Sequence, residues 1–461
     1  MSSNAKTLRI ALGAYLALAH AISTREARAE APLTLDESLV IATASASAPA
    51  LRAARHDAAS AAEDAVRAQR ARLPGLTLSA RYTRLSSIAE RYRSVSLDPT
   101  GASPPIVFSQ LLDNYNVRAA LEINLTDPFL RLAAAAEAAG DVAAARRLEA
   151  EATHARVIFD ARSAYFLLAR AHLGARIAED GLDAAQEQER LENDRVKAGT
   201  SPATRALGFS VAAAAARTRR AIANAEVGAA EAAMRQYLRV EDRERPLLLA
   251  PPSDAGDSDR DIPPQRPAPP GEPAAIRALE RGREAADAKL REETWALLPR
   301  LSVIATGDVS APSARVIGAS TLQTVPTWEL GAVLEIPLTQ LFGQLSGRAS
   351  AREGLGAAAA RLEEARRALE AQRGGARALR EGARSRLAAG RQTLVVARTL
   401  AETRRAELAA GLVIPLDVTS AESELLRARG EVADAELDLR LADARLDLLE
   451  GRTTHPSARP R

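Results

Sequence analysis

An internal duplication constrains this chain more than any other feature of its sequence. Residues 121–126 have the sequence LEINLT, and residues 334–339 repeat it as LEIPLT, with Phe129 and Phe342 three residues beyond the two copies. Two further echoes flank the motif in the same order: LPGL at 73–76 against LPRL at 298–301, and Ala-Gly at 198–199 against 410–411. The chain is therefore predicted to be a tandem repeat of about two hundred residues per copy.

Each repeat contains two runs in which apolar and polar residues alternate, and a period of two places each set on one face of a sheet. The apolar positions are Leu76, Leu78, Ala80 and Tyr82; Val117, Ala119, Leu121, Ile123 and Leu125; Leu301, Val303 and Ala305; and Trp328, Leu330, Ala332, Leu334 and Ile336. Each run has about ten residues, the length of a tilted strand that crosses a bilayer. The repeated pairs, with Tyr115 and Trp328 where strands start, favour transmembrane strands over a half-buried soluble sheet.

The rest of each repeat has helical sequence. A helix is predicted from Leu35 to Arg72, with Thr34 as its N-cap and a break at Pro49. Proline-free helical stretches run from about 130 to 197 and from about 344 to 410, on the order of 100 Å each. Each ends at an Ala-Gly turn and continues into a return helix, about 202–238 and 415–450. Each repeat is therefore predicted to contain a long helical hairpin whose tip lies far from the strands.

The last return helix shows how it packs. Two heptad series run along it: Val418, Leu425, Val432, Leu439 and Leu446, and Ala421, Ala428, Ala435, Ala442 and Leu449. Apolar residues at a and d positions over four heptads indicate a coiled-coil seam, and alanine at one position lets two backbones approach closely.

The two ends and the middle of the chain have different compositions. Residues 1–29 resemble a secretory signal: basic residues precede an apolar run that is too short to span a membrane, and Ala27-Arg28-Ala29 is a small-residue cleavage site. Residues 30–250 are predicted to form the first repeat and 274–450 the second, separated by a Pro-rich linker at 251–273 and followed by a flexible tail at 451–461. The chain has no cysteine, so disulfides and a lipid-anchored cysteine are not expected.

Composition argues against catalysis and nucleic-acid binding. The net charge is only +3, and arginines alternate with carboxylates instead of forming a basic patch. The five histidines are scattered, and we find no metal spacing, phosphate loop or nucleophile motif. We therefore expect neither an enzyme nor a cofactor, a metal site or a nucleic-acid partner.

Four strands leave a sheet with two open edges, and unpaired backbone groups are not tolerated in hydrocarbon. Because the smallest membrane barrels have about eight strands, two or three chains must share one barrel. The polar face then lines the lumen, where Glu122 and Glu335 stand at matched positions and Arg81 and Arg118 lie on the same side. Polar filler is the alternative interpretation of these residues.

The duplicated order of helix, strands, long helix, Ala-Gly turn and return helix resembles the TolC-type outer-membrane efflux family. The resemblance covers about residues 33–450. The matching residues are Leu73-Pro74, Tyr82, 121–126, Lys197-Ala198-Gly199, Leu298-Pro299, 334–339, and Ala410-Gly411-Leu412 with Leu416-Asp417-Val418. The resemblance implies an α+β membrane protein: a homotrimer with four transmembrane strands per chain, which form a twelve-stranded barrel that continues as a coiled-coil α-helical barrel in the periplasm.

The resemblance also implies a function. Such a protein is a passive exit duct in the outer membrane and its lipid, and it docks onto a periplasmic adaptor and an inner-membrane transporter of an efflux pump or type I secretion system. Gly199, Gly411 and Leu412 would form the docking tips, and Asp417 would narrow the pore, although a first-turn helix carboxylate is the plain alternative for Asp417. At the matched position of the first tip stands Arg205 or its neighbour, and not an acid, which puts a strongly cation-selective tip in doubt. The main rival interpretation is a periplasmic adaptor or coiled-coil scaffold, and an adaptor should contain one hairpin. A cytoplasmic structural coiled coil is the second rival.

Overall fold

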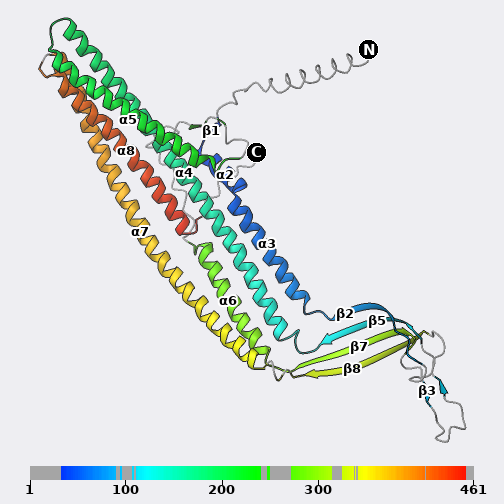
Figure 1. Cartoon of the computed structure of the whole chain (residues 1–461). Helices are drawn as coiled ribbons and strands as arrows, with labels where there is room; N and C mark the ends of the chain where they lie inside the picture. The colour runs from blue at the N-terminus through cyan, green and yellow to red at the C-terminus, as the bar shows by residue number, and fades with distance from the viewer. Residues whose placement is uncertain are drawn as a thin grey trace, which may run out of the picture. The chain divides into compact units, whose positions relative to one another are not determined.

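The duplication is visible in the order of the elements. The computed structural model describes residues 33–89, 94–95, 106–107, 111–239, 245, 247–249, 271–313, 324–336, 338, 341–410 and 412–452. The signal segment, most of the linker and most of the tail fall outside these residues. In the first repeat, α3 (Pro49–Arg70), β2 (Gly75–Arg84), β5 (Asp113–Asn124), α4 (Arg131–Lys197) and α5 (Ala203–Arg235) follow one another; in the second, α6 (Ala274–Trp295), β7 (Arg300–Ala311), β8 (Val325–Glu335), α7 (Leu341–Ala409) and α8 (Pro415–Leu449) do so (Figure 1).

The chain divides into two compact units, and each draws on both repeats. One unit, the helical unit, contains residues 1–52, 153–273 and 369–461. The other, the sheet unit, contains residues 53–152 and 274–368. Neither unit is formed by one repeat alone, so the predicted repeat boundaries describe the sequence and not the compact bodies.

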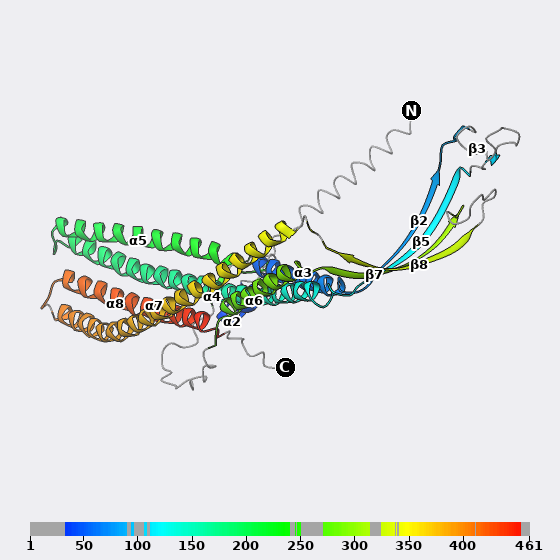
Figure 2. The same cartoon turned by 90° about the horizontal axis from the view of Figure 1, so that it is seen from below.

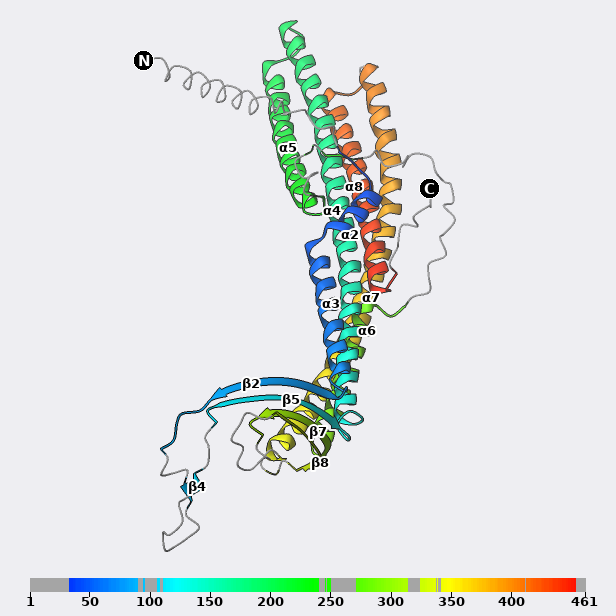
Figure 3. The same ribbon diagram turned by 90° about the vertical axis from the view of Figure 1, so that its right-hand side faces the viewer.

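The sheet unit contains one antiparallel sheet of four strands in the order β2-β5-β7-β8 (Figure 3). Its centre joins the repeats, since β5 pairs with β7 in the register Leu121↔Ala305. Within the described part of the chain, β2 and β8 each pair on one side only. The sheet therefore ends in two edges, as the sequence predicts.

In the sheet unit, charged pairs join α6 to the first part of α4. Arg291 of α6 donates two hydrogen bonds to the Glu137 carboxylate of α4, at 2.8 and 2.9 Å. Arg281 reaches Asp141 at 3.3 Å, and Arg277 reaches Glu151 at 3.2 Å. These contacts repeat along one side of α6, so they align α6 with α4, although exposed pairs stabilise by at most about 1 kcal/mol each.

The helical unit contains two antiparallel hairpins, α4 with α5 and α7 with α8, and their turns lie at the same end of the unit (Figure 2). Ion pairs join the hairpins: Asp438 of α8 accepts from Arg170 of α4 at 2.5 Å and from Arg386 of α7 at 2.8 Å. Close approach supports the packing of the two hairpins, because a Cβ on Gly181 of α4 would lie 3.5 Å from Leu426 of α8, and one on Gly430 of α8 would lie 3.7 Å from Ile177 of α4.

The heptad seam of α8 is confirmed. Eight of its ten positions are buried, and Val432 and Leu439 are half-buried. Leu425 packs with Ala397 and Ala401 of α7, and Leu446 with Ala376. Small residues on α7 thus receive the larger side chains of α8, as close helix pairing requires.

The predicted start of the first helix is wrong. Residues 33–35 form a strand, β1 (Leu33–Leu35), which pairs in parallel with β6 (Leu247–Leu249), a strand after the first hairpin. The helix α2 (Glu37–Ser47) begins after Asp36, whose side chain accepts from the Leu39 amide at 2.6 Å. Asp36, and not Thr34, is therefore the N-cap, because β1 holds Thr34 in an extended strand. The break at Pro49 is confirmed: α2 ends at Ser47 and α3 begins at Pro49.

The segment between β2 and β5 contains two further strands. Two short strands, β3 (Ser94–Val95) and β4 (Ile106–Val107), pair antiparallel within it. The strand β5 also begins four residues before Val117, because Asp113 and Tyr115 pair with the end of β2.

Candidate channel wall and helical tips

The sheet carries its polar residues on one face. Strand register places four charged residues of the sequence prediction there: Arg81 on β2, Arg118 and Glu122 on β5, and Glu335 on β8. Arg81 pairs in register with Asn116, which is the alternate neighbour of Arg118. Glu335 lies apart on the edge strand, where its register partner is Arg300.

The polar face is organised around Asp308 of β7, which sequence reasoning missed. Asn116 donates to the Asp308 carboxylate at 2.5 Å, and Arg118 lies 3.4 Å from the same oxygen. The alternation itself is the signal that points to Asp308, because it continues beyond Ala305 through Gly307, Asp308, Val309 and Ser310. Strands from the two repeats thus share a charged network on this face.

The opposite face of the sheet is apolar and exposed. The register aligns Leu76 with Leu121, and Leu121 with Ala305, on this face. Exposed fractions of the side chains are 74% for Leu76, 77% for Leu78 and 65% for Leu330. Contiguous apolar patches larger than a few hundred Å² are rare on soluble monomers and mark an interaction surface.

Aromatic residues stand at the end of this apolar face that is remote from the helices. Tyr82 and Tyr115 are register partners with ring centroids 5.1 Å apart. Trp328, which is 76% exposed, lies further in on the same face, in register with Gly307. The Tyr82 hydroxyl donates to Asp113 at 2.8 Å, and Asp113 also pairs with Arg84 at 3.3 Å. Amphipathic rings with a polar tip are typical of a membrane–water interface.

The first helical tip is a glycine-dependent turn. Gly199 has a φ of +70°, and its amide donates to Val196 while Thr200 donates to Arg195. This bond pair is the Schellman motif, which closes a helix by placing one residue in the left-handed region. The turn is further held by Ser201, whose hydroxyl donates to the buried carboxylate of Glu192.

The second tip repeats this closure at its matched position. The Leu412 amide donates to the Glu407 carbonyl at 2.9 Å, with the same five-residue offset as Thr200 to Arg195. Leu412 itself is 76% exposed. Gly411 and the side chain of Arg205 lie outside the described residues, so their predicted roles stay predictions.

Asp417 stabilises the start of α8. Its carboxylate accepts from the Ile414 amide at 3.2 Å, and its own amide donates to the Ile414 carbonyl at 3.0 Å. This is the return half of a capping box, in which a first-turn carboxylate satisfies a free backbone amide. The bond supports the helix-capping interpretation of Asp417, and its role in the pore stays a prediction.

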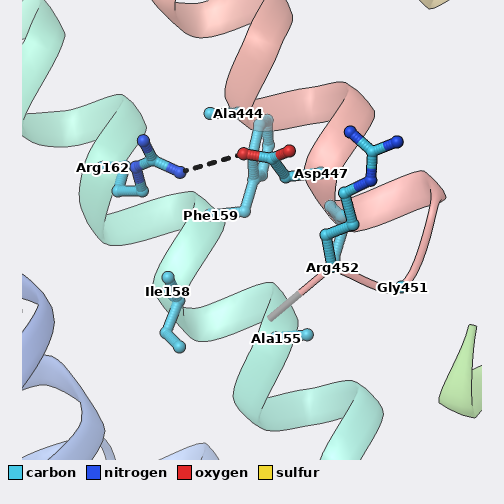
Figure 4. A pocket seen from close by; sticks show the side chains of 9 residues that line it. Ala155, Ile158, Phe159, Arg162, Ala444, Asp447, Gly451 and Arg452 are labelled. Carbon is cyan, nitrogen blue, oxygen red and sulfur yellow. Dashed lines mark ion pairs between the residues drawn. The ribbon is translucent and has the colours of Figure 1, made fainter. Parts of the chain in front are cut away.

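The described residues of the helical unit enclose a small cavity and a groove. A small cavity of about 30 Å³ lies between α4 and α8, lined by residues that include Arg162, Asp447 and Arg452 (Figure 4). It has room for little more than a water molecule. A groove of about 710 Å³ lies between α4, α5 and α8, and small and apolar residues such as Gly174, Ala230 and Gly430 line most of it.

Among the helices that the structure describes, none combines the length and the apolar character that crossing a membrane requires. The described residues also contain no group of three or more histidine, aspartate or glutamate side chains placed to hold a metal ion.

Solved structures share this fold. The Campylobacter jejuni CmeC outer membrane channel has a TM-score of 0.73 at 14% identity, with 94% of this chain and 91% of that chain covered. VceC, an outer membrane protein of Vibrio cholerae, has a TM-score of 0.70 at 19% identity, with 90% of this chain and 96% of that chain covered. The open state of the Neisseria gonorrhoeae MtrE outer membrane channel has a TM-score of 0.70 at 19% identity, with 91% of this chain and 90% of that chain covered. No curated protein matches the sequence.

The family model described as outer membrane efflux protein matches residues 40–238 and 272–452, which is most of the chain. Members of this family are channel proteins that act as trimers with adaptor and inner-membrane pump partners. The protein is accordingly an exit duct for efflux in the outer membrane, extending into the periplasm, and its two helical hairpins differ from the single hairpin expected of an adaptor. From its sequence match, fold and paired hairpins together, the chain belongs to the outer membrane efflux protein family.

Proposed function

We propose that three copies of this chain form one passive duct, in which their sheets close into a shared twelve-stranded barrel. The observation that carries the proposal is the sheet, whose edges β2 and β8 pair on one side only within the described chain and whose apolar face is exposed. A membrane leaves neither edge unpaired, because lipid offers no hydrogen bonds to backbone groups. Joining β8 of one copy to β2 of the next satisfies both edges.

The helical unit supports association between copies. Large apolar side chains are exposed on both hairpins. Val211 on α5 is 70% exposed, and two consecutive residues of α7, Val395 and Val396, are 66% and 67% exposed. Exposed apolar residues on helices that already bury a seam indicate a second packing surface. In the proposed trimer the hairpins of neighbouring copies pack along these faces and continue the barrel as a helical tube.

The proposed lumen is lined by the polar face. Arg81, Arg118, Glu122 and Glu335 would face water there, and Asp308 would hold Arg118 by the ion pair described above. Charges of both signs occur on this face, so the wall is proposed to pass solutes of either charge. Energy for transport would come from the inner-membrane transporter, since the chain offers the solute only a path.

The tips are the proposed docking surface for a periplasmic adaptor and the transporter of an efflux pump or type I secretion system. Both tips close by the same backbone bond, and Leu412 is exposed at one of them. Gly199 closes its turn in the left-handed region, and the same Ala-Gly pair stands at the end of α7.

Gly411→Pro tests the docking role. Proline fixes φ near −65°, so it could not take the conformation that Gly199 has at the matched position of the first tip, where φ is +70°. The second tip should therefore be distorted while the sheet, in the other unit, assembles normally. We expect export of the pump's substrate from cells to fall at least tenfold, while a heat-resistant oligomer still appears on SDS gels of outer membranes. Gly356→Ala, within α7 and with open space around its position, is the matched control. Normal export by Gly411→Pro would contradict the docking role.

A further inference from the structure

The two signs of charge on the polar face of the sheet lie at different heights. Strand register divides this face into rows that cross the four strands. Arg81 of β2 and Arg118 of β5 lie in the rows remote from the helices. Glu122 of β5 and Glu329 of β8 lie in rows nearer to the helices. The polar face is therefore basic towards one end of the sheet and acidic towards the other.

The basic rows contain Arg81, Arg118 and Asp308 and are called the outer belt. Arg118 Nε lies 3.4 Å from the Asp308 carboxylate, so these two charges offset each other. Arg81 is in register with Asn116, which is uncharged. Within the part of the chain that the structure describes, no carboxylate pairs with Arg81. The outer belt therefore keeps one net positive charge per chain.

The acidic rows contain Glu122 and Glu329 and are called the inner belt. Both residues are exposed. Their register partners are uncharged: Gly75 and Ile304 lie beside Glu122, and Thr306 lies beside Glu329. Neither carboxylate forms an ion pair with another described residue. The inner belt therefore carries two negative charges per chain.

The last row, at the helix end of the sheet, adds no net charge. Glu335 of β8 is in register with Arg300 of β7, and Arg300 lies 3.8 Å from the Asp127 carboxylate. Asp127 in turn pairs with Arg131 at 2.8 Å. Charges of opposite sign are equal in number there, so this row neither cancels nor extends the inner belt.

The two belts are far enough apart to attract different ions. Arg118 precedes Glu122 by four positions on β5. Four residues of strand span about 14 Å, and a tilt of about 40° leaves on the order of 10 Å along the axis of a barrel. The Debye length is also about 10 Å at an ionic strength of 0.1 M. Cations should therefore gather at the inner belt and anions at the outer belt.

We propose that the lumen of the shared barrel is a bipolar passage, in which the separated belts rectify the flow of ions. When the helix side is positive, the field drives cations from the inner belt and anions from the outer belt towards the boundary between the belts. Both kinds of ion accumulate there, and the conductance rises. The opposite polarity depletes the boundary of both. This inference rests on the proposed function, because it takes the polar face as the wall of a closed lumen.

The bipolar passage treats cationic solutes differently according to the side from which they arrive. A cationic solute that comes from the helix side meets the inner belt first and is concentrated there. A cationic solute that comes from the outside meets the outer belt first and is repelled. Under a driving force, the duct should therefore favour the outward passage of cationic solutes.

Currents across planar bilayers test the proposal on the full chain. Protein added to one chamber inserts its sheet and keeps its helices in that chamber, so the helix side is known. In 0.1 M KCl we expect the current to be roughly 1.5-fold larger when the helix side is positive. In 1 M KCl, where the Debye length is about 3 Å, the currents at the two polarities should be equal.

Two sets of variants separate the contributions of the belts. Glu122→Gln with Glu329→Gln removes the charge of the inner belt, and Arg81→Gln leaves the outer belt neutral. Either change should lower the asymmetry of the current by about half, since one charged belt remains. The reversal potential in a KCl gradient should shift towards anion selectivity in the first set and towards cation selectivity in the second. Thr77→Gln places the same amide on the polar face without removing a charge, and this matched control should keep the asymmetry.

Conservative variants protect the test against misfolding. Glu122→Asp with Glu329→Asp, and Arg81→Lys, keep the charges and should keep the asymmetry, and every variant is first checked as a heat-resistant oligomer on SDS gels. Three results for the assembled protein in 0.1 M KCl would overturn the bipolar passage and leave the duct intact: equal currents at the two polarities, a larger current at the opposite polarity, or an asymmetry that survives in either glutamine set. An assembled oligomer that carried no current at either salt concentration would instead contradict the proposed duct itself.

Discussion

The sheet and the α7/α8 hairpin both carry regular series of leucine and other apolar residues, but the hairpin buries them and the sheet exposes them. Leu425 in the seam of α8 is 7% exposed, whereas Leu78 at the centre of β2 is 77% exposed. Both belong to regular apolar patterns, with a period of seven in the helix and of two in the strand. A period therefore shows which residues share a face, but not what that face contacts.

The residues on the polar side of each element indicate what its apolar side contacts. Behind the helical seam lie charged residues such as Glu424, which are exposed, as on any helix that packs in water. Behind the apolar sheet face lies a network built on Asp308, with Arg118 and Asn116. The sheet gathers its charges on one face and exposes leucine on the other. Such a sheet fits a wall whose apolar face meets lipid and whose charged face meets a water-filled lumen.

The largest effect expected is at the centre of the apolar face. Leu78→Arg places a charge in lipid, which costs about 2–4 kcal/mol per chain at the bilayer midplane. We expect the heat-resistant oligomer to be lost from outer-membrane fractions. Thr77→Arg, one residue away on the polar face, should assemble normally, since its side chain would face water. Equal loss in the two variants would break the contrast between the faces.

The helical seam should respond to a loss of volume. Leu425→Ala removes a buried side chain that packs on Ala397 and Ala401, and such truncations cost about 2–5 kcal/mol. We expect faster hydrogen exchange along α7 and α8 in the detergent-solubilised protein. Glu424→Ala, on the exposed side of the same turn, should leave exchange unchanged. Unchanged protection in Leu425→Ala would mean that this seam contributes little to the hairpin.

Sequence reasoning reached the elements that depend on a period or a repeat. The strand pairs, the long helices and the α8 seam follow from spacing alone, and the duplication adds the matched tips. It failed at Thr34 because the pairing of β1 with β6 joins segments that are about two hundred residues apart, and no local pattern reports such a contact. The strand overrode a capping signal that was valid locally.

The charged face of the sheet was predicted in part for a similar reason. Arg118 could be assigned to the polar face from alternation, but its partner Asp308 comes from the other repeat and depends on the register of β5 with β7. Register between two strands of different repeats is set by the whole sheet, so the residues were predictable and their pairing was not.

Variants of Asp417 distinguish a role in capping α8 from a role in the pore. Asp417→Ala removes both the charge and the acceptor for the Ile414 amide, which should destabilise the start of α8 by about 1 kcal/mol. Asp417→Asn removes the charge and keeps an acceptor oxygen. If Asp417 only caps the helix, hydrogen exchange near the tip should rise in the alanine variant alone, and the ion selectivity of planar-bilayer currents should be unchanged in both. A shift in the reversal potential of Asp417→Asn would instead show that the carboxylate faces the pore.

The smallest effect concerns a half-buried carboxylate of the helical unit. Asp447 lines the cavity between α4 and α8, and its carboxylate lies 3.8 Å from Arg162, which also donates to Glu37 at 2.6 Å (Figure 4). Burial raises the pKa of Asp447 above its ordinary value of 3.8, while Arg162 and Arg452 oppose the shift. The neighbouring Asp443 and Glu450 raise the pKa further.

The sign of the pH dependence follows from this raised pKa. Between the ordinary value and the raised one, the folded chain binds more protons at Asp447 than the unfolded chain does, so the free energy of unfolding falls as pH rises from about 4 upward. Asp447→Asn removes the titrating group and should flatten that slope in thermal unfolding followed by helical circular dichroism. Glu424→Asn, on the exposed side of α8, should keep the slope of the parent protein. A slope that is unchanged in Asp447→Asn would show that the arginines around the cavity, and not its desolvation, control this carboxylate.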